Sequence, residues 1–155
     1  MNIKKEALRY LGYKGEPDLL TASLLERAEK AFTAVNPAYC CRITEKSDCG
    51  MLLQGSDIKE HLKDCERVII FAATLGAAAE KLIRTAEVFD MAYAVVLDAY
   101  ASACIEDYCD KCEEELKQKT GGFFTWRYSP GYGDYPVMMQ TELIWLTDAH
   151  RKIGL

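Results

Sequence analysis

The sequence predicts an α+β fold in which helices pack against a β-sheet, and three segments lead to this prediction. Residues 90–116 form the longest stretch with apolar side chains at helical spacing, which predicts one long helix. Residues 67–73 are continuously apolar and rich in β-branched side chains, as is typical of a buried central strand. Residues 127–136 concentrate proline, glycine and tyrosine, which favours a shaped loop over a helix or a strand.

Length and composition predict one globular domain over residues 1–155. Hydrophobic residues make up 50% of the chain and charged residues 28%, far from the composition of a disordered segment. The formal net charge of -5 argues against a broad basic surface for nucleic acid. No apolar signal core follows the first residues, and no apolar run approaches the roughly 20 residues that span a bilayer. We therefore expect a cytoplasmic protein that binds neither nucleic acid nor membrane.

Two helices are predicted before the first strand. Residues 3–11 place apolar side chains at helical spacing and stop at Gly12, which suits a C-terminal cap. A second amphipathic helix begins at a cap formed by Asp18 or Thr21 and ends at the Asn-Pro pair at 36–37.

A hairpin is predicted next. Residues 39–44 and 50–54 are short β-like segments on either side of a polar turn. A short helix over residues 58–62 then returns the chain to the strand at 67–73.

Two further helices follow the central strand. Residues 74–76, Thr-Leu-Gly, join the strand to a helix over 77–85, and close packing is the favoured interpretation because neither phosphate-binding consensus is met. On the long helix, Asp98, Ser102 and Glu106 recur every four residues and form one polar stripe. Such a stripe usually faces water, but Glu106 is the member that a nearby ligand loop could use.

The loop at residues 127–136 follows a predicted strand over 123–128 and precedes a predicted amphipathic helix over 137–146. Pro130 fixes φ, and the two glycines of the loop accept the positive φ that other residues avoid. The backbone must therefore turn sharply and expose N–H groups.

The side chains of this loop suit a small molecule. Arg127 offers a forked donor for a carboxylate or phosphate, while Tyr128, Tyr132 and Tyr135 offer faces for a ring or a cation. The alternative, which composition alone favours, is an ordinary tight connection whose tyrosines cover the core.

The cysteines are expected to remain thiols. Seven is an odd number for a disulfide framework. Cys109 and Cys112 have the spacing of a metal or redox pair, and Cys40, Cys41 and Cys49 could add ligands. No second Cys-x-x-Cys or histidine pair completes a tetrahedral set, so no metal is expected, and a zinc or iron–sulfur site stays the alternative.

The loop also matches a family signature. Arg127, Gly131 and Tyr132 fit the pattern Arg-x-x-x-Gly-Tyr, which Pro136 soon follows. With the long acidic helix and the glycine-rich break before it, this pattern resembles the activation domain of cobalamin-dependent methionine synthase and the small stand-alone relatives of that domain. The Thr-Leu-Gly turn at 74–76 looks like that of the stand-alone relatives. Our expectation of a bent, mainly antiparallel sheet rests partly on this resemblance.

The resemblance implies a module that binds S-adenosylmethionine and presents it to a cobalamin-binding methyltransferase module for reductive remethylation. Arg127 would pair with the methionine carboxylate through two parallel hydrogen bonds. Ser129 and its neighbours, Gly131 included, map to a segment that uses backbone groups on the ligand. Tyr132 maps to the signature tyrosine, and Glu106 maps to a glutamate on the long helix of the family. The protein would be an accessory domain rather than a complete enzyme, and a flavodoxin-type electron donor is implied.

Cobalamin is expected only through a partner. His61 and His150 lack the Asp-x-His-x-x-Gly setting of a histidine that ligates cobalamin. We expect both to be surface or capping residues.

The chain departs from the family pattern at three places. The family's further aspartate, from its N-terminal part, has no counterpart, and Met138 stands where the family has a histidine. The family domain also continues past the helix that ends near Leu155, with further strands and a second aromatic ligand segment that we expect to be missing here. The resemblance covers residues 74–155 well and the first third loosely. The missing C-terminal segment motivates the alternative of a non-catalytic scaffold or docking protein with the same fold that has lost ligand binding.

Overall fold

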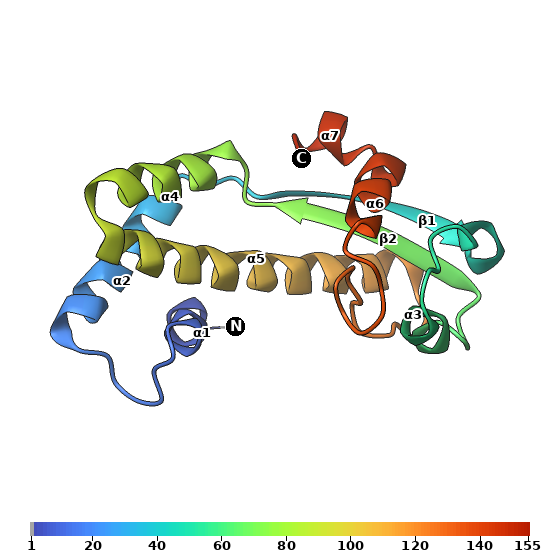
Figure 1. Cartoon of the computed structure of the whole chain (residues 1–155), viewed down its shortest axis with the longest axis horizontal. Helices are drawn as coiled ribbons and strands as arrows, with labels where there is room; N and C mark the ends of the chain where they lie inside the picture. The colour runs from blue at the N-terminus through green and yellow to red at the C-terminus, as the bar shows by residue number, and fades with distance from the viewer. Residues whose placement is uncertain (1) are drawn as a thin grey trace. The chain divides into compact units, whose positions relative to one another are not determined.

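The structure, a computed structural model that describes residues 2–155, contains seven α-helices, one 3-10 helix and one antiparallel pair of strands (Figure 1). It confirms the predicted α+β class and the long helix. The chain divides into two compact units. The first contains the residues up to Ala38 together with Thr74–Glu115, and the second contains Tyr39–Ala73 together with Leu116–Leu155.

The first unit consists of helices. They are α1 (Ile3–Tyr10), α2 (Leu19–Phe32), α4 (Ala77–Phe89) and most of α5 (Met91–Thr120). At the start of α2, the carboxylate of Asp18 accepts hydrogen bonds from the Thr21 N–H at 2.8 Å and from the Tyr13 hydroxyl. The Tyr13 hydroxyl, followed by the Thr21 N–H, lowers the pKa of Asp18 to about 2. Asp18, rather than Thr21, is therefore the N-cap of α2.

The core of the first unit gathers around α5. Leu97 exposes 0% of its surface, and Tyr100 meets Phe32 edge to face with 5.2 Å between the ring centroids. Buried alanines from four helices let the backbones approach closely; they are Ala7, Ala28, Ala86, Ala94 and Ala103. The alternation of small and large side chains explains why an alanine-rich helix lies at the centre of this unit.

The second unit holds the strands and the C-terminal helices. Its elements are β1 (Ala38–Glu45), a 3-10 helix η1 (Lys46–Cys49), α3 (Ser56–His61), β2 (Arg67–Thr74), α6 (Met139–Thr147) and α7 (Ala149–Lys152), with the end of α5. A small core forms where Ile58 and Leu62, at α3, meet Tyr135 and Met139. This core joins α3 to the segment that precedes α6.

The predicted hairpin over 39–44 and 50–54 is wrong. Residues 39–44 do belong to a strand, β1, but residues 50–54 form a turn and an irregular segment, and β1 pairs with β2. β2 offers eight consecutive residues rich in β-branched and aromatic side chains, so it competes better for the edge of β1 than a short segment that begins with Gly50. Because the described sheet has two strands, β2 is not the buried central strand we expected, and only Ile70 in it is buried.

The predicted strand over 123–128 is also wrong, because these residues form no regular secondary structure. Strand propensity measures how well a side chain fits a half-buried pleated surface. Phe123 is instead fully exposed, and Trp126 exposes 75% of its surface. These aromatic side chains therefore lack the sheet surface against which such a strand would pack.

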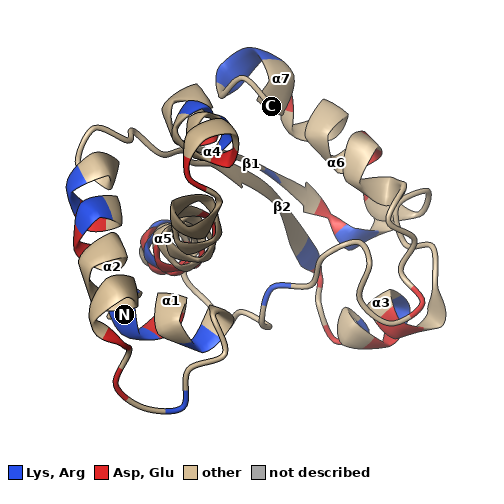
Figure 2. Cartoon of the chain, turned by 60° about the vertical axis from the view of Figure 1, so that its left-hand side comes forward, with Lys and Arg blue, Asp and Glu red and all other residues tan. Residues whose placement is uncertain are grey.

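Charged residues of both signs are interspersed along the elements of each unit (Figure 2). In the described part of the chain, no helix combines the length and the apolar character needed to cross a membrane. The long helix α5 fails this requirement because acidic and basic side chains recur along it.

Candidate functional site

The predicted turn in residues 127–136 is present and closes on itself. Gly131 and Gly133 have φ values of 96° and 52°, a region that glycine enters without strain. The Gly131 N–H donates to the Tyr135 carbonyl at 2.8 Å, and the Tyr132 N–H donates to the Ser129 carbonyl at 3.1 Å. We expected the turn to expose its N–H groups, but those of Gly131 and Tyr132 are already used within the loop. These two hydrogen bonds give the turn a defined shape.

Helix α3 is hydrogen-bonded to the C-terminal part of this loop, at Asp134. One Asp134 carboxylate oxygen accepts from the Ser56 N–H at 2.6 Å and from its hydroxyl, while the other accepts from the Asp57 N–H at 3.0 Å. In return, the Asp57 carboxylate accepts from the Asp134 N–H at 3.1 Å. The Ser56 hydroxyl, followed by the two N–H groups, lowers the pKa of Asp134. The N-cap residue, Gly55, has no side chain, so the first two N–H groups of α3 are paired with a carboxylate 77–78 residues away in the sequence.

Two glycines permit this close contact. A Cβ atom on Gly133 would overlap the Asp57 carboxylate and lie 2.8 Å from the Tyr128 hydroxyl. A Cβ atom on Gly55 would lie 2.5 Å from an Asp134 carboxylate oxygen. Any larger residue at either position would push the loop away from α3.

An aromatic cluster lies at the near end of the loop. The ring of His61 lies 4.9 Å from the ring of Trp126 and 4.9 Å from that of Tyr128. Its Nε2 lies 3.0 Å from the Trp126 carbonyl oxygen, and because a carbonyl only accepts, Nε2 must carry the proton. Tyr128 also contacts Tyr132 edge to face, with 5.9 Å between the centroids. Burial, followed by the nearby Asp57 and Asp134 charges, raises the pKa of Tyr128.

The sequence left two roles open for the tyrosines of the loop, contact with a ligand and cover for the core, and the structure divides the three residues between them. Tyr135 is 5% exposed and belongs to the small core, and Tyr128 packs against that core. Tyr132 exposes 59% of its surface. Two rings therefore cover the core, as in an ordinary connection, while the side chain of Tyr132 is exposed to solvent.

The predicted site residues fall in both units. Ser129, Gly131 and Tyr132 are exposed, and Arg127 is half-buried, all in this one loop of the second unit. Glu106 belongs to the first unit, where it is an exposed residue of α5.

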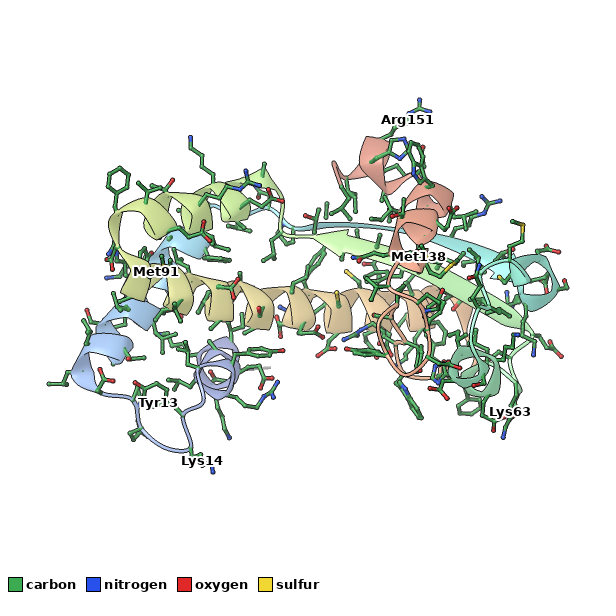
Figure 3. All side chains as sticks on the ribbon, in the orientation of Figure 1. Tyr13, Lys14, Lys63, Met91, Met138 and Arg151 are labelled. Atoms are coloured by element: carbon green, nitrogen blue, oxygen red, sulfur yellow. The ribbon has the colours of Figure 1, made fainter. Side chains whose placement is uncertain are left out.

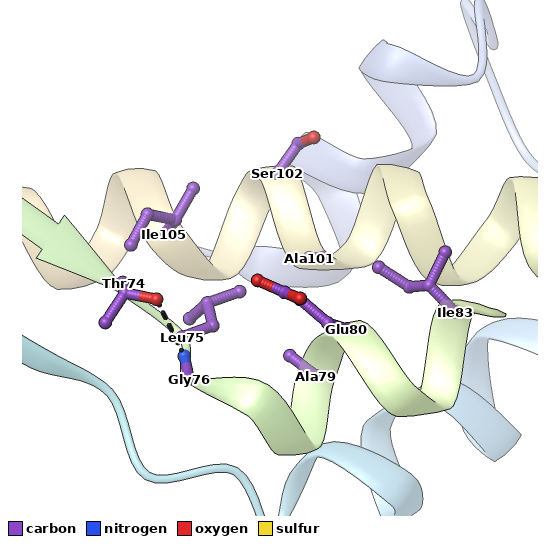
Figure 4. A pocket seen from close by; sticks show the side chains of 9 residues that line it. All are labelled: Thr74, Leu75, Gly76, Ala79, Glu80, Ile83, Ala101, Ser102 and Ile105. Carbon is purple, nitrogen blue, oxygen red and sulfur yellow. Dashed lines mark hydrogen bonds between the residues drawn. The ribbon is translucent and has the colours of Figure 1, made fainter. Parts of the chain in front are cut away.

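The first unit contains a groove that one residue of the polar stripe helps to line (Figure 4). The groove has a volume of about 230 Å³, and most of its lining is apolar, contributed by the Thr-Leu-Gly turn, α4 and α5. Ser102, the middle member of the stripe, lines it together with Glu80 of α4. The Thr74 hydroxyl accepts from the Gly76 N–H at 2.9 Å and holds the turn that forms one wall. The packing role that we expected for this turn stays a prediction.

All seven cysteines are free thiols. Cys109 and Cys112 lie within α5, and burial raises the pKa of the neighbouring Cys104 to about 11. Among residues 2–155, no group of three or more His, Cys, Asp or Glu side chains is arranged to hold a metal ion.

The sequence did not reveal the residues that hold the loop. Ser56 and Asp57 were recognised at the start of a helix, but nothing near them indicated Asp134 as their partner. His61 was expected at the surface or at a cap; it is half-buried and lies beside two aromatic rings, a contact that the sequence did not indicate. The available signal was Gly55 and Gly133 themselves, because glycine is often used where the backbone approaches another group closely.

No protein-family model and no curated protein matches the chain. The resemblance to the methionine synthase activation domain therefore stays a prediction that rests on the residues of the loop.

Proposed function

We propose that the protein binds S-adenosylmethionine in the loop at residues 127–136 and serves in the cytoplasm as a reactivation module for a cobalamin-dependent methyltransferase such as methionine synthase. The observation that carries this proposal is the fixed shape of the loop that bears the Arg-x-x-x-Gly-Tyr pattern. Its turn is closed by internal hydrogen bonds and its far end is fastened to α3. A loop ordered before binding loses less conformational entropy when the ligand arrives.

The chemistry of the loop suits the two ends of this ligand. Arg127 can pair with the carboxylate of the methionine part through two parallel hydrogen bonds. The exposed aromatic side chain of Tyr132 can contact a sulfonium cation or an adenine ring. The role of Glu106 stays a prediction that rests on the resemblance alone.

The bound ligand would supply the methyl group that converts reduced cobalt in a partner to the methylated form. Cobalamin would enter only through that partner, and a flavodoxin-type protein would supply the electron. The part of this chain would be to hold the ligand in one orientation, which removes rotational freedom from the transfer step. We therefore regard it as an accessory domain rather than a complete enzyme.

Calorimetric titration with S-adenosylmethionine tests this proposal. We expect the wild type to bind and Arg127→Ala to bind about 10- to 100-fold more weakly, since a hydrogen-bonded charge contributes about 1.5–3 kcal/mol. Arg127→Lys should be intermediate because lysine cannot form the bidentate pair. S-adenosylhomocysteine, which lacks the positive sulfur, should bind more weakly to the wild type.

Arg151→Ala is the matched control. Arg151 belongs to the same unit, and its side chain projects outward from α7 (Figure 3). Its loss should leave the affinity unchanged. The proposal is wrong if the wild type does not bind S-adenosylmethionine, or if Arg127→Ala binds as well as the wild type while its circular dichroism is unaltered.

A scaffold or docking role is the second candidate, and a specific observation favours it. Large apolar side chains of the second unit are strongly exposed; they are Trp126, Val137, Met138 and Trp145, at 75%, 65%, 75% and 60%. Exposed apolar side chains that lie together are typical of protein-binding surfaces, and Val137 and Met138 are neighbours in the sequence. This role predicts that the chain binds a corrinoid protein in the absence of S-adenosylmethionine, and that Arg127→Ala leaves this binding intact.

A further inference from the structure

We propose that His61 is a positioning residue for Arg127, acting through the peptide group that joins Trp126 to Arg127. This inference rests on the proposed function of the loop, since the purpose of the positioning is ligand binding. His61 itself is not expected to touch the ligand.

The hydrogen bond of His61 restrains a whole peptide group, not only the carbonyl oxygen that accepts it. Its Nε2 donates to the Trp126 carbonyl oxygen at 3.0 Å. Because a peptide group is planar, the same bond orients the N–H and the Cα of Arg127. The His61 ring adds a second restraint, since it lies 4.9 Å from the rings on both sides of Arg127 in the sequence, Trp126 and Tyr128.

The opposite end of the loop is held by the same helix. Asp57 and Ser56, in the first turn of α3, bind Asp134. His61 is the last residue of α3, so one short helix contacts the chain both before and after the residues proposed to touch the ligand.

Helix α3 is packed into the small core of the second unit. Ile58 and Leu62 expose 5% and 9% of their surfaces and belong to the small core of the second unit. Side chains that position a binding group are effective when packing locks their own conformation. The polar side of α3 can therefore act as a fixed support for the loop.

Two substitutions separate the donor of His61 from its ring. His61→Phe keeps a flat ring and removes the donor, whereas His61→Gln keeps a donor and removes the ring. We expect His61→Phe to weaken S-adenosylmethionine binding about three- to tenfold, the usual effect of one lost hydrogen bond. His61→Gln should recover part of this loss. Wild-type affinity in His61→Phe, or no recovery in His61→Gln, would overturn the proposal.

A double-substitution cycle tests whether His61 acts through Arg127. In the Arg127→Lys background, His61→Phe should weaken binding much less than in the wild type, because the group to be positioned has already lost its bidentate geometry. Equal effects in both backgrounds would show that His61 acts independently of Arg127 and would reject the positioning role.

A measurement without ligand separates this inference from the proposed function. The chain has two tryptophans and two histidines, and each described tryptophan ring lies beside one histidine ring: Trp126 beside His61, and Trp145 beside His150 at 4.2 Å. With Trp145→Phe, fluorescence anisotropy reports the mobility of Trp126 alone. His61→Phe should lower this anisotropy, while His150→Phe, the matched control, should not.

The two failures are distinguishable. A wild type that does not bind S-adenosylmethionine refutes the proposed function, whereas an unchanged Trp126 anisotropy in His61→Phe refutes the positioning of this segment whether or not a ligand binds.

Discussion

Replacing Gly133 by alanine is expected to lower the free energy of unfolding by roughly 2–4 kcal/mol and to release the loop from α3. Two effects add. Alanine at a φ of 52° adopts a left-handed conformation that L-residues avoid, and its Cβ would overlap the Asp57 carboxylate. To relieve the overlap, Asp57 must leave the Asp134 N–H, which removes one of the four hydrogen bonds between Asp134 and the first turn of α3.

Gly121→Ala is the control that isolates the backbone effect. Gly121 also has a positive φ, 67°, but nothing lies within 4 Å of a Cβ built there. It should therefore show only the left-handed penalty, about 1–2 kcal/mol. Chemical denaturation followed by tryptophan fluorescence suits both variants, because Trp126 and Trp145 lie in the second unit, as the two glycines do. Equal destabilisation by the two substitutions would mean that the close approach of the loop to α3 contributes nothing.

Replacing Leu97 by alanine should lower the free energy of unfolding by about 3 kcal/mol, within the 2–5 kcal/mol range typical of such core truncations. Leu97 is one of the largest side chains that are fully buried, and its neighbours in the core of the first unit include many alanines. Small neighbours on helices cannot move far into the space left behind, so a cavity should remain.

Val95→Ala provides the comparison on the same helix. Val95 exposes 54% of its surface, so its truncation should change the stability by less than about 0.5 kcal/mol. Far-UV circular dichroism is the appropriate probe, because the first unit contains no tryptophan and consists of helices. A shift in Leu97→Ala no larger than that in Val95→Ala would contradict the packing described here.

The helices could be predicted because their signals are local. Side-chain periodicity placed α2, α4 and α5, and the caps at Asp18 and Gly12 lie within a few residues of the ends they mark. Even so, α4 and α5 run four residues further than predicted, to Phe89 and Thr120. Helix ends depend on capping partners more than on periodicity, so such differences are usual.

The strands were harder to predict because a strand forms only when another segment pairs with it. Residues 39–44 carry the same local signal whether the chain pairs with 50–54 or with β2, and only the competition between these segments decides. Residues 123–128 have strong strand propensity, but they form no strand because they pair with no other strand of the described chain.

The candidate site likewise has a part that could be predicted from local residues and a part that could not. Pro130 and the glycines predicted the turn, since turn chemistry depends on single residues. The support of the turn could not be predicted, because Asp134 and Ser56 lie 78 residues apart and His61 and Trp126 lie 65 apart. Hydrogen bonds across such separations leave no periodic trace in a single sequence.

The segment between α5 and the loop also makes the chain susceptible to proteolytic nicking. Residues 123–128 have no regular structure and expose Phe123 and Trp126, the large aromatic side chains after which chymotrypsin-like proteases cleave accessible, extended chain. A single cut after Phe123 would remove the covalent link between α5 and Arg127. The new terminus would still be held by His61 at Trp126, and the loop by α3 at Asp134. A nicked form would thus keep the candidate site attached to the second unit by hydrogen bonds and by α6, rather than by the backbone from α5.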